Sequence, residues 1–275
     1  MSQPFSLLTI AGSDSGGAAG LQADLKTWAA LGAHGMSAVT AVTAQNSERV
    51  AAVHFLPPEL IAAQIDAVLS DYGAAAIKTG FLGRVEIVEA VAERLAYWRD
   101  NREGRGGSQT RPYTRPRIIV DPVLVNHRGE PMFPTEVAAA YRELLLPLAD
   151  LVTPNVREAE LLGLVAGVPG RQNRPAGTDR VLVKGASRTA GEIVDVFWNG
   201  DQPIELPQQF IDTINTHGSG DTLSAAVCFY VAGGHDWLEA VRRAQAFTHA
   251  AIARGAAWRL GGGHGPLGHQ PPRSG

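Results

Sequence analysis

Residues 6–44 read SLLTIAGSDSGGAAGLQADLKTWAALGAHGMSAVTAVTA, and this stretch indicates the fold class. The apolar run 6–11 has the length of a buried strand and ends in Gly-Ser-Asp. Across residues 20–31, leucine and tryptophan recur every three or four positions, which predicts a helix with one apolar face. Gly32 follows as a helix-ending glycine, and apolar and β-branched residues then fill 36–44. The stretch therefore predicts a strand–helix–strand unit.

The same alternation continues along the chain. Repeated strand–helix units are joined by right-handed crossovers, so they predict a mainly parallel sheet with helices on both faces. We therefore expect an α/β fold, a three-layer α/β/α sandwich, with residues 1–275 forming a single domain. Further strands are predicted at 74–78, 117–121, 151–153 and 181–184, a hairpin at 193–198 and 203–206, and further helices at 57–69, 85–98, 135–146, 155–162, 221–231 and 237–254.

Two segments break the alternation. Residues 100–116 are rich in arginine, glycine and polar side chains. Because Asp100 and Glu103 are mixed with the arginines, we interpret the segment as a flexible insertion rather than a nucleic-acid-binding arm. Residues 268–275 are expected to form a disordered tail.

The composition excludes several classes of protein. The 275 residues are 45% hydrophobic and 19% charged, which is enough apolar material for a large core and excludes a disordered chain. A net charge of −3 provides no general attraction for nucleic acid or an anionic membrane. Cys228 is the only cysteine, so no disulfide forms within the chain. With no basic leader and no long apolar stretch, we expect a cytoplasmic enzyme without nucleic-acid or membrane partners.

Lysine is rare in this chain. Only three lysines, Lys26, Lys78 and Lys184, stand among the 24 cationic side chains. Arginine therefore supplies the general surface charge, and a retained lysine can mark a place that needs a compact ammonium group. For any single lysine chance retention is the favoured explanation, and Lys78 is assigned no role from the sequence.

Polar residues follow the predicted strands, each at the point where a strand ends. Ligands of parallel sheets bind beyond the carboxyl ends of the strands, so these residues predict an active site at one edge of the sheet. They are Ser13-Asp14, Gln45-Asn46, Asp121, Thr153-Pro154-Asn155 and Lys184-Gly185.

The strongest local motif is THGSGDTL at residues 216–223. Gly218 and Gly220 place bare backbone amides at the start of a predicted helix, where amides and the helix dipole bind an anion such as phosphate. Asp221 then stands where a carboxylate can accept the proton of an attacking hydroxyl. The alternative is a simple turn with Asp221 as the helix N-cap. No Walker loop or dinucleotide fingerprint is present, which disfavours a GTPase or a dehydrogenase.

Taken together, the motifs resemble the ribokinase-like superfamily and, within it, the hydroxymethylpyrimidine/phosphomethylpyrimidine kinases of thiamine synthesis. The resemblance covers nearly the whole chain. Its opening block and its Gln-Asn pair are specific to the pyrimidine kinases. The motifs are LTIAGSDSGGAAGLQADLKT (8–27), GAHG (32–35), AVTAQN (41–46), IKTG (77–80), VDPV (120–123), TPNVRE (153–158), VKG (183–185), NTHGSG (215–220) and GHGPL (263–267).

The resemblance implies a ribokinase-like fold and a phosphotransferase that uses ATP and Mg²⁺. It implies phosphorylation of 4-amino-5-hydroxymethyl-2-methylpyrimidine to the monophosphate and then to the diphosphate, by a homodimer. Two alternatives stay open: a pyridoxal/pyridoxine kinase of the same superfamily, and a catalytically weak ligand-binding protein on this fold. Many pyrimidine kinases carry Gly-Thr-Gly-Cys in the anion loop. This chain has Ser219 and Asp221 there, closer to sugar and pyridoxal kinases.

The resemblance also implies roles for individual residues. Gln45 has the amide donor and acceptor that an aminopyrimidine edge needs, and Asp24 is expected to accept a hydrogen bond from the substrate hydroxymethyl group. The expected set is Asp221 with the amides of Gly218, Ser219 and Gly220 for catalysis; Gln45, Asp24, Gly12 and Ala19 for the pyrimidine; Lys184, Thr216 and Asn155 for ATP; and Glu158 and Asp121, largely through water, for magnesium.

Overall fold

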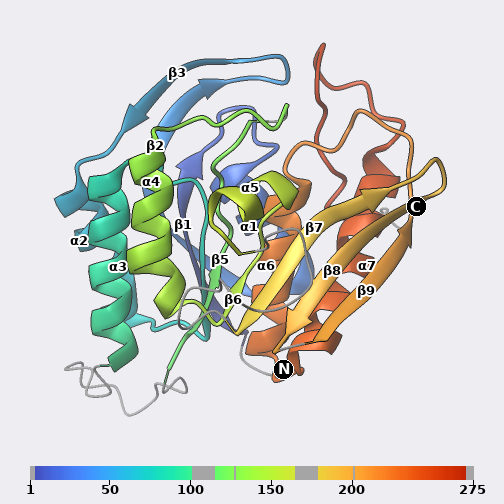
Figure 1. Ribbon diagram of the computed structural model, residues 1–275. Helices are drawn as coiled ribbons and strands as arrows, with labels where there is room; N and C mark the ends of the chain where they lie inside the picture. Colours follow the sequence, from blue (N-terminus) through green and yellow to red (C-terminus); the bar gives the residue numbers. More distant parts are fainter. Residues whose placement is uncertain (1–3, 101–114, 127, 165–178, 201, 271–275) are drawn as a thin grey trace.

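The computed structural model describes residues 4–100, 115–126, 128–164, 179–200 and 202–270. In these ranges nine strands form one sheet in the order β3-β2-β1-β4-β5-β6-β7-β8-β9 (Figure 1). The strands are β1 Ser6–Ser13, β2 His34–Gln45, β3 Val50–Phe55, β4 Ala76–Thr79, β5 Arg117–Val120, β6 Leu151–Val152, β7 Arg180–Arg188, β8 Glu192–Asn199 and β9 Gln202–Gln209.

The six central strands, from β2 to β7, pair in parallel. The strands at the two edges, β3 on one side and the β8–β9 hairpin on the other, pair antiparallel. The predicted mainly parallel sheet and the predicted hairpin are confirmed. Strand β3 was not predicted, because nearly all of its side chains are exposed and its sequence therefore lacks the apolar alternation of a half-buried strand.

Helices cover both faces of the sheet, as predicted. Figure 1 shows α2, α3 and α4 beside one another on one face, while α1, α6 and α7 cover the other. The helices are α1 Gly20–Leu31, α2 Pro58–Asp71, α3 Val85–Asp100, α4 Thr135–Ala140, α5 Val156–Leu161, α6 Ser219–Ala232 and α7 Trp237–Gly255. The helix predicted at 135–146 continues beyond α4 as a π-helical turn, Tyr141–Leu145, and a 3₁₀ turn, Leu146–Leu148. Pro147 has no N–H with which to continue an α-helical ladder.

Two apolar cores lie on the two faces, and successive strand residues alternate between them. Leu8 and Ile10 belong to the core under α2 and α3, whereas Leu7 points to the core under α1, α6 and α7. This alternation follows from the two-residue period of a strand. On the second face the indole N–H of Trp28 donates to the carbonyl oxygen of Ala225 at 2.7 Å, which ties α1 to α6.

The strand order indicates which edge of the sheet should bind a ligand. The chain moves from β1 outward to β2 and β3, and then returns to the other side of β1 with β4. A crevice forms at such a reversal, beyond the carboxyl ends of the two strands on either side. The ends of β1 and β4 are therefore where the fold predicts a ligand.

Residues 268–270 of the predicted disordered tail are held in place. Gly268 N donates to Ala251 O at 2.9 Å, and the Arg254 guanidinium donates to Gly268 O at 2.7 Å. His269 is buried, with its Nε2 2.9 Å from the Thr222 hydroxyl. The prediction was wrong for residues 268–270, because these contacts with α6 and α7 hold the segment. Residues 271–275, residues 101–114 of the predicted insertion 100–116, and residues 165–178 lie outside the described residues, whereas Asp100 is the last residue of α3.

None of the helices in the described ranges is both long and apolar enough to cross a membrane.

Gly218 is required where α6 begins. Its φ is +82°, a conformation that favours glycine, and an added Cβ would overlap the carbonyl oxygen of Ala18. Gly234 has a similar φ of +86° with open space around the Cβ position. We expect Gly234→Ala to lower the free energy of unfolding by about 1–2 kcal/mol, from backbone strain alone. Gly218→Ala should lower the free energy of unfolding, measured by urea titration, by clearly more than Gly234→Ala. Equal losses in the two variants would contradict the close contact between Gly218 and Ala18.

Candidate active site

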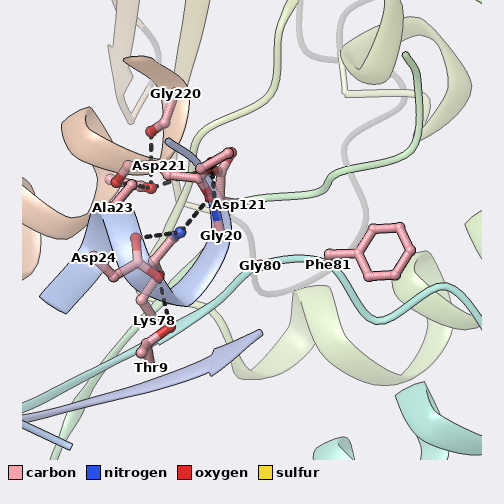
Figure 2. Close-up of polar contacts among 12 residues, drawn as sticks. Thr9, Gly20, Ala23, Asp24, Lys78, Gly80, Phe81, Asp121, Gly220 and Asp221 are labelled. Carbon is pink, nitrogen blue, oxygen red and sulfur yellow. Dashed lines mark hydrogen bonds and ion pairs between the residues drawn. The ribbon is translucent and has the colours of Figure 1, made fainter. Parts of the chain in front are cut away.

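Four charged side chains meet near the start of α6. Figure 2 shows Asp24, Lys78, Asp121 and Asp221 directed toward one another, from α1, β4, the end of β5 and α6. Of these four, Asp121 is one of the polar residues that the sequence placed after a strand, whereas Asp24, Lys78 and Asp221 lie within helices and a strand.

The loop after β1 is folded around Asp14. The carboxylate of Asp14 accepts hydrogen bonds from the backbone N–H groups of Gly16, Ala18 and Ala19 at 2.8, 2.9 and 2.9 Å. This arrangement brings Gly20 to the start of α6, where its N–H donates to Asp221 Oδ2 at 3.1 Å. Three backbone donors on one carboxylate fix the loop without a helix or strand. Ala19, predicted to leave room for the substrate ring, is part of this loop.

Asp221 does not cap its own helix. Gly218 occupies the N-cap position of α6, and Asp221 lies in the first turn. Its two carboxylate oxygens accept hydrogen bonds from Gly20 N–H and from the Lys78 ammonium group. Its side chain is 13% exposed. The alternative of a simple N-cap is therefore wrong, because both oxygens are directed to groups outside α6.

Lys78 is the residue of this site that the sequence did not identify. It lies in β4 with a fully buried side chain, and its Nζ is 2.7 Å from Asp24 Oδ1 and 2.8 Å from Asp221 Oδ1 (Figure 2). A buried ammonium group is stable only when it is paired and hydrogen-bonded. Burial opposes the charge, but the two carboxylates outweigh it and raise the pKa of Lys78. A lysine within the apolar strand Ala-Ile-Lys-Thr, in a chain with few lysines, was the available signal.

Asp24 does not lie where the sequence placed it. Its side chain is fully buried, and it accepts hydrogen bonds from Thr9 Oγ1 at 2.6 Å and from Lys78 at 2.7 Å. A carboxylate without exposed surface cannot accept a hydrogen bond from a bound substrate. The predicted contact of Asp24 with the hydroxymethyl group is therefore not supported. Burial, assisted by the negative charge of Asp221, raises the pKa of Asp24 to about 7 against the opposing effect of Lys78.

The pKa of Asp221 is shifted in the opposite direction to that of Asp24. Burial alone would raise the pKa of Asp221, but the Lys78 ammonium group and the Gly20 N–H favour the charged form. The net result is a pKa below the ordinary value of an aspartate. The two carboxylates on either side of Lys78 therefore differ, and the one with exposed surface is the one held ionised.

A second charged group lies next to the anion loop. Lys184 Nζ is 2.7 Å from Asp121 Oδ1, and Asp121 also accepts from the hydroxyls of Thr153 and Ser224 at 3.1 and 3.0 Å. An added Cβ on Gly220 would lie 3.0 Å from Lys184 Nζ. The ammonium group is thus beside the backbone of the Gly-Ser-Gly loop, where one cation and several amides together suit a phosphate group.

Asn155 and Glu158 form a capping box at the start of α5. Asn155 Oδ1 accepts from Glu158 N–H, and Glu158 Oε2 accepts from Asn155 N–H, both at 2.9 Å. The other oxygen of Glu158 accepts from Leu124 N–H at 3.2 Å. Burial raises the pKa of Glu158, while Lys184 opposes the shift. Asp121 is paired with Lys184, and the Lys184 charge also acts on Glu158. The predicted roles of Glu158 and Asp121 toward magnesium, and of Asn155 and Thr216 toward ATP, stay predictions.

Gln45 is paired with a residue that the sequence did not assign. Gln45 Nε2 lies 2.9 Å from His217 Nε2, and His217 lies 3.7 Å from Asp14 Oδ2. With the amide nitrogen as donor, His217 accepts at Nε2 and carries its proton on Nδ1. The Gln45 carbonyl, which Thr43 Oγ1 approaches at 3.4 Å, keeps an acceptor site for a ring amine. Asp14 and His217 also line a cavity of about 1310 Å³.

Gly12 makes room for an aromatic side chain. An added Cβ there would lie 3.0 Å from the ring of Phe81. The Phe81 ring stacks on Phe55 and tilts against Phe133, with ring centroids 5.8 and 5.4 Å apart. Figure 2 shows Phe81 directed away from the charged group. This apolar wall was not predicted, because its three rings come from segments far apart in the sequence.

Comparisons with known proteins agree with this geometry. A family model described as phosphomethylpyrimidine kinase matches residues 14–103 and 107–268. The chain belongs to this family. It is 43% identical over 270 residues to the hydroxymethylpyrimidine/phosphomethylpyrimidine kinase of Rhizobium meliloti, covering 95% of this chain and 96% of that one.

Solved structures confirm the ribokinase-like fold of the phosphomethylpyrimidine kinase family. The ADP complex of Bacillus subtilis pyridoxal kinase aligns with a TM-score of 0.81 at 32% identity, covering 98% of each chain. The phosphomethylpyrimidine kinase of Clostridium difficile aligns with a TM-score of 0.71 at 33% identity, covering 90% of this chain and 99% of that one. Both vitamin kinases share the architecture, so the fold alone does not separate their substrates.

The raised pKa of Asp24 predicts a pH-dependent stability difference. Between about pH 4 and pH 7 the unfolded chain has released this proton while the folded chain keeps it. Stability contributed by Asp24 therefore falls as pH rises through this window, by up to ~1.4 kcal/mol per pH unit. We expect the unfolding free energy of the wild type to decrease relative to Asp24→Asn from pH 4.5 to pH 7, in urea titrations of both proteins. Parallel profiles across this range would contradict the shift.

Proposed function

We propose that this protein transfers the γ-phosphoryl group of ATP to the hydroxymethyl group of 4-amino-5-hydroxymethyl-2-methylpyrimidine, and then to the resulting phosphate, in thiamine biosynthesis. The observation that carries the proposal is Asp221, ionised and fixed at the start of α6 beside Lys184, in a chain of the phosphomethylpyrimidine kinase family. A weak ligand-binding protein would have no need for a buried cation that keeps this carboxylate charged.

The residues have complementary roles in phosphoryl transfer. Positioning and charge stabilisation dominate such reactions. The oxygen of the substrate hydroxyl attacks the γ-phosphorus in line, and Asp221 receives the hydroxyl proton. The bond between the γ-phosphorus and the bridging oxygen breaks, and ADP leaves with that electron pair.

The amides of Gly218 and Gly220 at the start of α6 stabilise the phosphoryl oxygens. The predicted contribution of the Ser219 amide is not supported, because its N–H donates to the Thr216 carbonyl oxygen at 3.1 Å. Lys184, next to this loop, neutralises charge on the nucleotide phosphates.

The residues near Lys184 fit a magnesium ion that is held largely through water. The described residues contain no group of three or more histidine, cysteine, aspartate or glutamate side chains arranged to hold a metal. Asp121 and Glu158 are nevertheless carboxylates near Lys184, and magnesium commonly takes one or two carboxylates together with phosphate oxygens and water. When bound, the ion would neutralise charge on the phosphates, with Asp121 and Glu158 holding its water ligands.

A pyridoxal kinase is the second candidate. It is favoured by Asp221 in place of the cysteine of many pyrimidine kinases and by the fold match to Bacillus subtilis pyridoxal kinase. The Gln45 amide, oriented by His217, favours the aminopyrimidine. The homodimer and the cytoplasmic location stay predictions.

A substrate panel separates the two candidates. The protein is incubated with ATP, magnesium and, in turn, the hydroxymethylpyrimidine, its monophosphate, pyridoxal and pyridoxine, and the products are resolved by ion-exchange chromatography. We expect mono- and diphosphate from the pyrimidines at a higher kcat/KM than from either pyridine. A preference for pyridoxal would reverse the assignment, and monophosphate alone would remove the second step.

Asp221→Asn tests the proton acceptor. An amide cannot take the hydroxyl proton, so we expect kcat to fall by about 100- to 10,000-fold. ATP affinity should change little, because the backbone amides and Lys184 remain. Turnover by a coupled assay and ATP binding by calorimetry measure both effects on one preparation. Near-normal turnover in the folded variant would remove Asp221 from this role.

A further inference from the structure

Lys78 is too deeply buried to touch a substrate, yet it contacts the carboxylate that does. Its side chain has no exposed surface, whereas that of Asp221 is 13% exposed. Figure 2 shows Lys78 between Asp24 and Asp221, with Thr9 behind Asp24. These charges come from three different elements, β4, α1 and α6. Any role of Lys78 in the reaction must therefore pass through Asp221.

The contacts fix both oxygens of Asp221. Lys78 Nζ holds Oδ1 at 2.8 Å, and the Gly20 N–H holds Oδ2 at 3.1 Å. A carboxylate has about four lone-pair sites, so each oxygen can still accept a further hydrogen. The two donors thus orient the carboxylate, and its exposed surface can still receive the proton of a substrate hydroxyl.

Asp24 completes the surroundings of Lys78, and above its pKa of about 7 it offsets part of the ammonium charge. Its Oδ1 lies 2.7 Å from the ammonium group, and its side chain has no exposed surface. Above about pH 7, where Asp24 is ionised, its loss would let the whole charge of Lys78 act on Asp221 and make Asp221 a weaker proton acceptor. Without Lys78, two carboxylates would share one buried site and at least one would take up a proton.

We propose that Lys78 and Asp24 are positioning residues that hold Asp221 ionised, oriented and moderate in proton affinity, so that it can accept the proton of the substrate hydroxyl. This proposal rests on the proposed function, because it assigns Asp221 as the proton acceptor. The other charged groups facing Asp221 are Lys184 from β7 and Asp121 at the end of β5, themselves paired at 2.7 Å. The opposite pKa shifts of Asp24 and Asp221 agree with this arrangement.

The pH dependence of kcat tests the proposal. Lys78→Met removes the cation and keeps a side chain of similar length. We expect the acidic limb of its kcat profile to move upward by about 1–3 pH units, with activity regained at alkaline pH. Lys78→Arg keeps the charge and should keep the limb near its wild-type position. In Asp24→Asn, Lys78 keeps its charge and has Asp221 as its remaining carboxylate partner. The acidic limb of the kcat profile of this variant should therefore not move upward.

A surface ion pair provides the control. Arg243→Met breaks the exposed pair between Arg243 and Glu239 on α7, at 2.7 Å, and should leave the profile unchanged. A folded Lys78→Met enzyme with the wild-type limb would overturn the proposal, as would an upward shift in Lys78→Arg. If Lys78→Met does not fold, the double variant Asp24→Asn/Lys78→Met removes both buried charges, and its limb must also move upward.

A second measurement does not depend on the substrate. Urea unfolding of the wild type, both single variants and the double variant forms a double-mutant cycle. We expect the double variant to lose clearly less stability than the two single losses together, because each single change leaves a buried partner uncompensated. Additive losses would overturn the proposed pairing. If the wild type phosphorylates no pyrimidine, the proposed function fails, while the cycle still decides the pairing.

Discussion

A lysine ammonium group buried inside a sheet stays charged only when carboxylates surround it, and this constraint organises the site. Lys78 in β4 requires Asp24 from α1 on one side and Asp221 from α6 on the other. The cost of an unpaired buried charge forces both helices to approach the same point of the sheet. Trp28 and Ala225 hold the same two helices together further along their lengths. Local electrostatics and helix packing therefore favour one arrangement.

The charged group lies where the topology leaves a crevice. The reversal of strand order between β1 and β4 opens the sheet edge at this position. Thr9 of β1 stands opposite Lys78 of β4 in the parallel register, and both donate to Asp24. The anion loop then closes over the edge, because Gly218 packs directly against the backbone of Ala18. The anion loop, the proposed proton acceptor Asp221 and its buried counter-charge Lys78 are thus held by one set of contacts.

Asp221 distinguishes this chain from many kinases of its family, and the surroundings suit a carboxylate. A buried aspartate normally gains a proton, which would remove its ability to accept one. Lys78 and the Gly20 amide counter that tendency. The arrangement also bears on substrate choice, since the fold is shared with pyridoxal kinase and only side chains near the groove, such as Gln45 and His217, can separate two vitamin precursors.

The sequence by itself determined the alternation of strands and helices, the Gly-Ser-Gly-Asp loop and the active edge, because these depend on periodicity and on backbone freedom that residue types encode locally. It could not reveal β3, whose side chains are mostly exposed, or the Phe55–Phe81–Phe133 wall, whose rings are distant in the chain. Only the tertiary structure decided the partners of the charges. It showed that Asp24 pairs with Lys78 and not with the substrate, the partner predicted from the sequence, and that His217 contacts Gln45. Spacing along a chain specifies which face a side chain occupies, but which buried charges neutralise one another depends on distances set by packing across the whole sheet.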